Sequence, residues 1–182
     1  LHYMSESLYL LEEGMGVETL DRYFTHKFGM PMGPCRLMDE VGLDVCVKVL
    51  KIFKDAYSDR IQVSDLAKKL SESGRLGKKN SKGFYLYDDK GKQLEVDQTI
   101  YKDLGLGSPT NKVPEKECID RPMYLMVNEA AMAMLQDHIV DTPANCDLAM
   151  IMGTGFPPFR GGLLKWADSV GSKQIVDDLE MY

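Results

Sequence analysis

The sequence predicts an all-α protein made of two tandem, related helical units. Three observations lead to this prediction. Apolar residues recur with helical spacing along most of the chain, only one short segment has the pattern of strands, and a Gly- and Pro-rich motif near the N-terminus recurs near the C-terminus. We therefore expect about nine or ten helices and at most one short hairpin.

The composition sets limits on the class of protein. The chain has 182 residues, of which 44% are hydrophobic and 27% charged, enough for a substantial core. A formal net charge of -6 disfavours a nucleic-acid binder, which usually has a basic face. We expect no membrane span, because no run of about 18 apolar residues occurs. The start also lacks the pattern of a signal peptide.

The N-terminal half has helical spacing from its first residues. We expect helices over 4–13 and 17–28, the second ended by Gly29. Because no cap precedes the first helix, we expect the sequence to be a piece of a longer protein. After a tight Gly/Pro connection, Asp44 is expected to cap a helix. The predicted inward stripe of that helix consists of Val45, Val49, Ile52 or Phe53, and Ala56.

A basic, aromatic segment follows one more helix, expected over 63–73 and ended by Gly74. Its four cations suit a solvated basic loop better than a phosphate site, although an anion site stays open: Arg75, Lys78, Lys79 and Lys82. Residues 84–87 are aromatic and 88–91 form a turn, which predicts a strand or small hairpin.

The C-terminal half reads as four helices. A long helix over 115–139, apolar on nearly all sides and interrupted at Arg121-Pro122, is expected to be central and buried. Thr142 should cap a helix that runs to about 152, and helices over 163–167 and from Ser172 should follow.

The recurring motif suggests a duplication. Residues 29–44 and 155–171 each end one helix, turn through Gly and Pro, and open an apolar segment with Asp and then Val-Gly. The upstream helices correspond as well, with Glu6 opposite Glu129 and Asp21 opposite Asp147. We expect a first domain over 1–98, a linker over 99–114 and a second, degenerate copy over 115–182.

No catalytic or metal-binding pattern stands out from the residues alone. The stretch from Gly153 to Pro158 begins like a dinucleotide fingerprint, but lacks the third glycine and follows a helix. The three histidines are unpaired, so no metal site is predicted. The four cysteines lack Cys-x-x-Cys spacing, which favours buried reduced thiols: Cys35, Cys46, Cys118 and Cys146. Trp166 is expected to lie in the core.

Longer motifs carry a family resemblance. Residues 28–44, 74–79 and 82–87 resemble the C-terminal domain of 3-hydroxyacyl-CoA dehydrogenases. Residues 127–130, Asp147 and 153–162 resemble the second, degenerate copy in the α subunit of the multifunctional fatty acid oxidation complex. The order of both copies is more specific than either motif.

The resemblance implies that the chain is part of an NAD-dependent enzyme of fatty acid β-oxidation that oxidises (3S)-3-hydroxyacyl-CoA. Its catalytic His and the carboxylate that orients it would belong to a Rossmann domain outside this sequence, so we expect no catalytic residue, no bound NAD and no activity here. The implied substrate-contacting residues form a cleft wall: Met30, Pro31, Met32 and Pro34, with Met152 where relatives can have Tyr.

The resemblance also implies partners and a compartment. These are the Rossmann and enoyl-CoA hydratase domains of the parent chain, an acyl-CoA substrate and a thiolase β subunit, with no nucleic acid. The parent is expected in the cytoplasm, or in the mitochondrial or peroxisomal matrix of a eukaryote. The alternative is a freestanding helical assembly module without catalysis.

Overall fold

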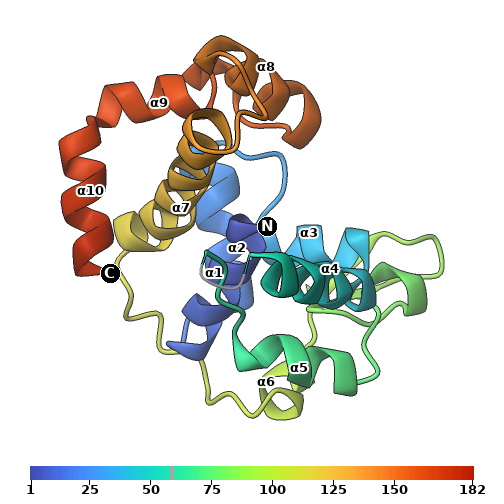
Figure 1. Ribbon diagram of the computed structural model, residues 1–182. Coiled ribbons are helices and arrows are strands. Elements are labelled where there is room, and N and C mark those ends of the chain that lie inside the picture. The colour runs from blue at the N-terminus through green and yellow to red at the C-terminus, as the bar shows by residue number, and fades with distance from the viewer. Residues whose placement is uncertain (58–59) are drawn as a thin grey trace.

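Helices dominate the computed structural model, which describes residues 1–57 and 60–182 (Figure 1). The α-helices are α1 (His2–Glu12), α2 (Val17–Arg22), α3 (Pro34–Val41), α4 (Leu43–Ala56), α5 (Asp65–Glu72), α6 (Thr99–Asp103), α7 (Glu115–Leu135), α8 (Pro143–Thr154), α9 (Leu163–Val170) and α10 (Ser172–Met181). The shorter elements are the π-helical η1 (Tyr23–Phe28), the 3-10 turns η2 (Lys78–Asn80) and η3 (Pro158–Arg160), and the antiparallel strands β1 (Tyr85–Tyr87) and β2 (Gln93–Val96). The predicted all-α class with one short hairpin is confirmed.

The core is built around α1 and α7, which pack along each other. In Figure 1, α8, α9 and α10 surround α7, while α3 to α6 lie on the opposite side of α1. Leu8, Leu10 and Leu11 of α1 are buried, because this helix also contacts α3 and α5. Tyr3 lies edge-on to Phe24, with 4.8 Å between ring centroids. Helix α1 therefore connects the two halves of the molecule.

A buried cation joins α1 to α7. The Arg121 guanidinium donates from Nε to Glu6 over 2.8 Å and from Nη1 to Glu13 over 2.7 Å. A guanidinium at this depth is tolerated because carboxylates accept its hydrogen bonds and balance its charge. The pairing fixes the register of the two helices.

Several predicted helix ends are confirmed. Gly29 ends η1 with φ +97°, a conformation that glycine adopts without a steric penalty. Thr142 Oγ1 accepts a hydrogen bond of 3.2 Å from Asn145 N at the start of α8. The helix expected over 63–73 begins slightly later, because Ser64 caps α5 by accepting from Leu66 N over 3.0 Å.

The predicted face and cap of α4 were wrong. Gly42 precedes the helix, and Asp44 pairs instead with Lys79 at 2.8 Å. The buried stripe is Leu43, Cys46 and Leu50, whereas Ile52 is 64% exposed. Both faces of this helix are apolar, so contacts with α3 and α5 decide which one turns inward.

The long C-terminal helix differs from the expectation in three ways. It ends at Leu135 and runs without interruption through Pro122. Pro122 removes a backbone donor, which costs about 3 kcal/mol, but it is buried in the core, and Arg121 beside it forms ion pairs with Glu6 and Glu13. Its buried residues all lie between Cys118 and Tyr124, because its C-terminal half borders an open groove.

The expected linker, residues 99–114, is partly helical and packed against the first unit. It contains α6, whose Ile100 is buried. Val17 N donates to Tyr101 Oη over 3.0 Å, and Gly16 N donates to Asn111 Oδ1 over 2.8 Å. The weak periodicity concealed this helix because α6 has only five residues.

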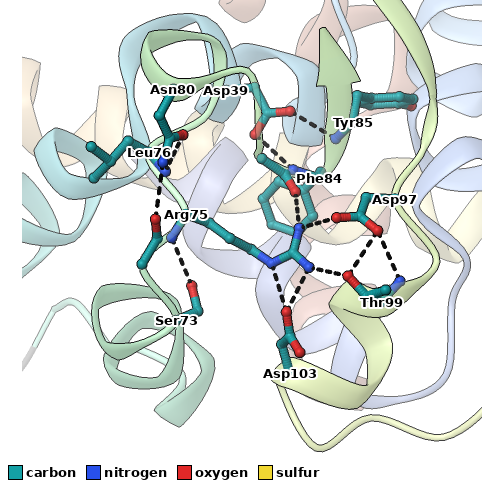
Figure 2. Close-up of polar contacts among 12 residues, drawn as sticks. Asp39, Ser73, Arg75, Leu76, Asn80, Phe84, Tyr85, Asp97, Thr99 and Asp103 are labelled. Carbon is teal, nitrogen blue, oxygen red and sulfur yellow. Dashed lines mark hydrogen bonds and ion pairs between the residues drawn. The ribbon is translucent and has the colours of Figure 1, made fainter.

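The prediction of a solvated basic loop was wrong for its first residue, Arg75. Arg75 is 1% exposed and holds the loop, the hairpin and α6 together (Figure 2). Its Nη1 donates to Gly83 O over 2.8 Å and to Asp97 Oδ2 over 2.7 Å, and its Nη2 donates to Asp103 Oδ2 over 2.6 Å. Lys78 and Lys79 form ion pairs with Glu40 and Asp44. The segment is thus a structural ion network.

We expect Arg75→Met to lower the free energy of unfolding by about 3–5 kcal/mol, because Asp97 then keeps a buried carboxylate without its counterion. Denaturant unfolding measures the effect. Lys68→Met is the control, since the Lys68–Glu72 pair is exposed and 4.0 Å long, and it should change stability by less than about 1 kcal/mol. Equal effects of the two variants would contradict the structural role of Arg75.

Candidate functional site

Two Gly/Pro loops, the first over 29–33 and the second over 155–162, pack against each other. A Cβ atom added to Gly29 would lie 2.7 Å from Phe159 Cζ, and one added to Gly155 would lie 2.9 Å from Pro31 Cγ. Each loop therefore has its glycine beneath an apolar ring of the other. Arg160 completes the contact, donating from Nε to Phe28 O over 2.8 Å.

Aromatic rings support the loops from below. Phe28 lies edge-on to Phe156 and to Trp166, with centroid distances of 5.6 and 5.2 Å. The Arg160 guanidinium lies 4.2 Å from the centre of the Phe28 ring, a favourable cation–π distance. Trp166 is buried, which confirms its predicted place in the core. These rings make the base of the two loops rigid.

A buried carboxylate anchors the first loop to α3. Asp21 accepts from Cys35 N over 2.8 Å and from Arg36 N over 3.0 Å, the first free donors of α3. Tyr85 Oη donates to the same carboxylate over 2.8 Å. A Cβ added to Gly33 would lie 2.3 Å from Asp21 Cγ, so only glycine allows this approach.

The second loop has the same anchor. Asp147 accepts from Leu164 N over 2.6 Å and from Lys165 N over 3.1 Å at the start of α9. Gly162 has φ +116°, and a Cβ there would lie 2.3 Å from Asp147. Both loops are thus held by an aspartate of the preceding helix and a glycine before the next helix.

A third carboxylate binds the hairpin. Asp39 of α3 accepts from Phe84 N and Tyr85 N, each over 2.9 Å, and from Tyr87 Oη over 3.0 Å. Burial raises the pKa of Asp39 to about 6, and it raises the pKa of Asp21 likewise to about 6. The hydrogen bonds to these carboxylates oppose that shift.

The predicted substrate-contacting residues divide by depth. Met30 and Pro34 are buried beneath the first loop, while Pro31 is exposed and Met32 half-buried. The Met32 carbonyl accepts a hydrogen bond of 2.8 Å from Tyr3 Oη. Met152 is 78% exposed near the end of α8, three residues before the Gly155 that contacts Pro31.

Two further apolar side chains were missed by the sequence analysis. Phe159 is 76% exposed above Gly29, and Leu148 is 59% exposed one turn before Met152 on α8. The spacing of Leu148 and Met152 on α8 could have indicated their shared face. The position of Phe159 depends on contacts between loops, which local sequence does not reveal.

The described residues also show where the other motifs of the sequence lie. Among them, no group of three or more His, Cys, Asp or Glu side chains could hold a metal ion. The segment from Gly153 follows α8 directly, and Gly155 faces Pro31, so a dinucleotide phosphate has no strand-to-helix turn to bind there. His2 Nε2 lies 3.5 Å from Glu129 Oε2, and burial lowers the pKa of His2. The four thiols are free and buried, as predicted.

Known proteins resemble this chain in sequence and in fold. Residues 1–87 match the family model of the 3-hydroxyacyl-CoA dehydrogenase C-terminal domain. This part of the chain is similar to that domain. The whole chain is similar to fatty acid oxidation complex subunit alpha of Shewanella halifaxensis, 42% identical over 180 residues, which are 99% of this chain and 25% of that protein. The same subunit of Idiomarina loihiensis is 40% identical over 178 residues, which are 98% of this chain and 25% of that protein. The resemblance predicted from the motifs is confirmed.

The chain spans about a quarter of the length of the curated relatives it matches. Among solved structures, 3-hydroxybutyryl-CoA dehydrogenase of Escherichia coli has the same fold, with TM-score 0.71 and 21% identity, over 96% of this chain and 52% of that one. The dehydrogenase part of multifunctional enzyme 1 from C. elegans matches with TM-score 0.63 and 27% identity, over 88% of this chain and 36% of that one. No helix among the described residues is long and apolar enough to cross a membrane.

We expect Gly33→Ala to destabilise the protein by about 1–3 kcal/mol, because the new Cβ would overlap Asp21 and push it from α3. The control is Gly153→Ala within α8, where a Cβ meets nothing within 4 Å. It should stabilise the protein by about 0.5–1 kcal/mol. Thermal unfolding of both variants provides the comparison, and a neutral Gly33→Ala would show that the anchor is not constrained.

The raised pKa of Asp39 predicts a pH dependence. The folded protein holds this proton more tightly than the unfolded chain, so the associated stability is present below the ordinary pKa of 3.8 and is lost as pH rises through about 6. Between about pH 4 and 7 the free energy of unfolding of the wild-type chain should therefore fall by up to about 3 kcal/mol more than that of Asp39→Asn. Denaturant unfolding across this range measures it. If the wild-type chain instead gained stability relative to Asp39→Asn as the pH rises, the pKa of Asp39 would be lowered in the folded protein.

Proposed function

We propose that the chain is the C-terminal helical part of a fatty acid oxidation α subunit and forms one wall of its 3-hydroxyacyl-CoA dehydrogenase cleft. The observation that carries the proposal is the similarity to such subunits over 99% of the chain, together with the family match of residues 1–87. The parent would oxidise a (3S)-3-hydroxyacyl-CoA with NAD and would also hydrate enoyl-CoA.

The two halves are proposed to be duplicates, with domains over 1–98 and 115–182 joined by 99–114. Several matching details support this. Asp21 with Gly33 corresponds to Asp147 with Gly162, and each aspartate accepts from the first residues of the following helix. The helices α3 and α9 also end at glycines of nearly equal conformation, with φ +100° at Gly42 and φ +97° at Gly171.

The substrate wall is proposed to consist of Pro31, Met32 and Met152, with Met30 and Pro34 supporting the first loop beneath them. These side chains are apolar or sulfur-containing and suit an acyl chain. Because the aspartate anchors and aromatic base fix the loops, the wall is preorganised and excludes water from one side of the cleft.

The reacting groups are proposed to lie in other domains of the parent. NAD, which accepts the hydride when bound, would be held by a Rossmann domain of the parent, and the stretch from Gly153 supports this because it does not form the strand-to-helix turn of a dinucleotide site. The hydratase domain and a thiolase β subunit are the proposed further partners. A bacterial parent would act in the cytoplasm.

In the full-length parent, Met152→Asp should raise KM for a long-chain 3-hydroxyacyl-CoA by about tenfold or more, since a carboxylate would replace an apolar contact with the acyl chain. The hydratase activity measures whether the rest of the protein is intact. Ile52→Asp on α4 is the matched control, exposed but remote from the loops. Unchanged dehydrogenase kinetics in Met152→Asp would remove Met152 from the wall.

The alternative, an assembly module without catalysis, makes a different prediction. It expects loop substitutions to leave dehydrogenase kinetics unchanged and to alter only association. The isolated 182-residue chain should transfer no hydride from 3-hydroxybutyryl-CoA to NAD, measured as NADH absorbance, with the full-length parent as the positive control. Turnover by the isolated chain would contradict the proposed location of the reacting groups.

A further inference from the structure

An open groove of about 740 Å³ lies between α7, α8, α9 and α10. Its walls are mostly apolar, with Val127 and Ala131 from α7, Ala167 from α9 and Ile175 from α10. Five polar side chains also line it: Asn128, Asp147, Lys165, Asp168 and Ser172. The Asp168 side chain forms no hydrogen bond or ion pair within the described residues, and it is exposed. The groove thus combines an apolar floor with an unused acceptor.

The first unit shows what covers the equivalent face there. Counting from the paired glycines Gly42 and Gly171, Asp39 corresponds to Asp168. Asp39 accepts two consecutive backbone donors, Phe84 N and Tyr85 N, from the strand segment that lies across α3. In the second unit, the corresponding carboxylate is present but no such segment lies on it.

Asp147 and Asn128 also have counterparts in the first unit that bind other parts of the chain. Asp21, equivalent to Asp147, accepts the hydroxyl of Tyr85 over 2.8 Å while it anchors α3. Ser5, equivalent to Asn128, donates to the backbone carbonyl of Gln62 over 2.8 Å. Two of these positions in the first unit, Asp39 and Asp21, therefore bind the strand segment at Phe84 and Tyr85, and the third, Ser5, binds the backbone just before α5.

The floor of the groove is hollowed by smaller residues. Leu8 of the first unit corresponds to Ala131, and Met38 corresponds to Ala167. Each exchange removes several heavy atoms where the first unit is filled and buried. The space created suits a large side chain brought by a ligand.

We propose that this groove binds an extended peptide segment in which a glycine precedes two aromatic residues. Its two consecutive backbone N–H groups donate to Asp168, a tyrosine hydroxyl donates to Asp147, and an aromatic ring fills the space above Ala131 and Ala167. The inference depends on the proposed equivalence of the two units, and it does not depend on dehydrogenase activity.

The test uses a synthetic peptide with the sequence of residues 82–88, capped at both ends, and a scrambled peptide of equal composition. Isothermal titration to the 182-residue chain should detect the native-order peptide and not the scrambled one. Asp168→Ala should weaken binding by about tenfold or more, because two charge-assisted hydrogen bonds are lost. Since Asp168 is exposed, this variant should keep its fold, as circular dichroism would verify.

Two further variants make the result specific. Asp177→Ala on α10 removes a carboxylate that pairs with Lys173 outside the groove, and it should leave affinity unchanged. Ala131→Leu restores the side chain of the first unit and should abolish binding by filling the floor. The test does not use the dehydrogenase activity of the full-length protein, so a failure to bind the peptide would not contradict the proposed function.

Three outcomes would overturn the proposal. The first is absence of binding at millimolar peptide, and the second is equal affinity for Asp168→Ala and the parent chain. The third is sedimentation that shows self-association abolished by Ala131→Leu, which would mean that a second copy of the chain covers the groove.

Discussion

An aspartate that accepts the first backbone donors of the next helix is the constraint on which this fold depends. It occurs at Asp21 and again at Asp147, and each needs a glycine that leaves room for the carboxylate. The arrangement serves two purposes at once. It satisfies donors that a helix start would leave free, and it fixes the path of the loop before that helix.

The loops then determine how the two units meet. Because each loop is held at its end, its glycine can face the ring of the other loop without further adjustment. Arg160 spans the same contact through its bond to Phe28 O and its position over the Phe28 ring. The surface formed by Pro31 and Met32 is therefore positioned by residues more than 100 positions away in the chain. In the proposed function, this contact is what would position the wall of the substrate cleft.

Most helices could be predicted from the sequence, because their caps and stops are local. Gly29 and Thr142 show this, since each acts on neighbouring residues. The errors arose where distant residues decide. The inward face of α4 depends on α3 and α5, and the burial of Arg75 depends on Asp97 and Asp103, which lie far along the chain. The motif of the loops and the correspondence of Asp21 with Asp147 were visible in the sequence, but the hydrogen bonds of these aspartates to the next helix were not.

The reciprocal packing of the two loops has a consequence for how such units associate. A polypeptide with only one unit would leave Phe28 and the surface of Gly29 without the rings that cover them here. Only association with another molecule could then cover these residues, and the extent of that association would depend on protein concentration. Joining both units in one chain makes this an intramolecular encounter at high effective concentration. The geometry of the loops is then insensitive to dilution.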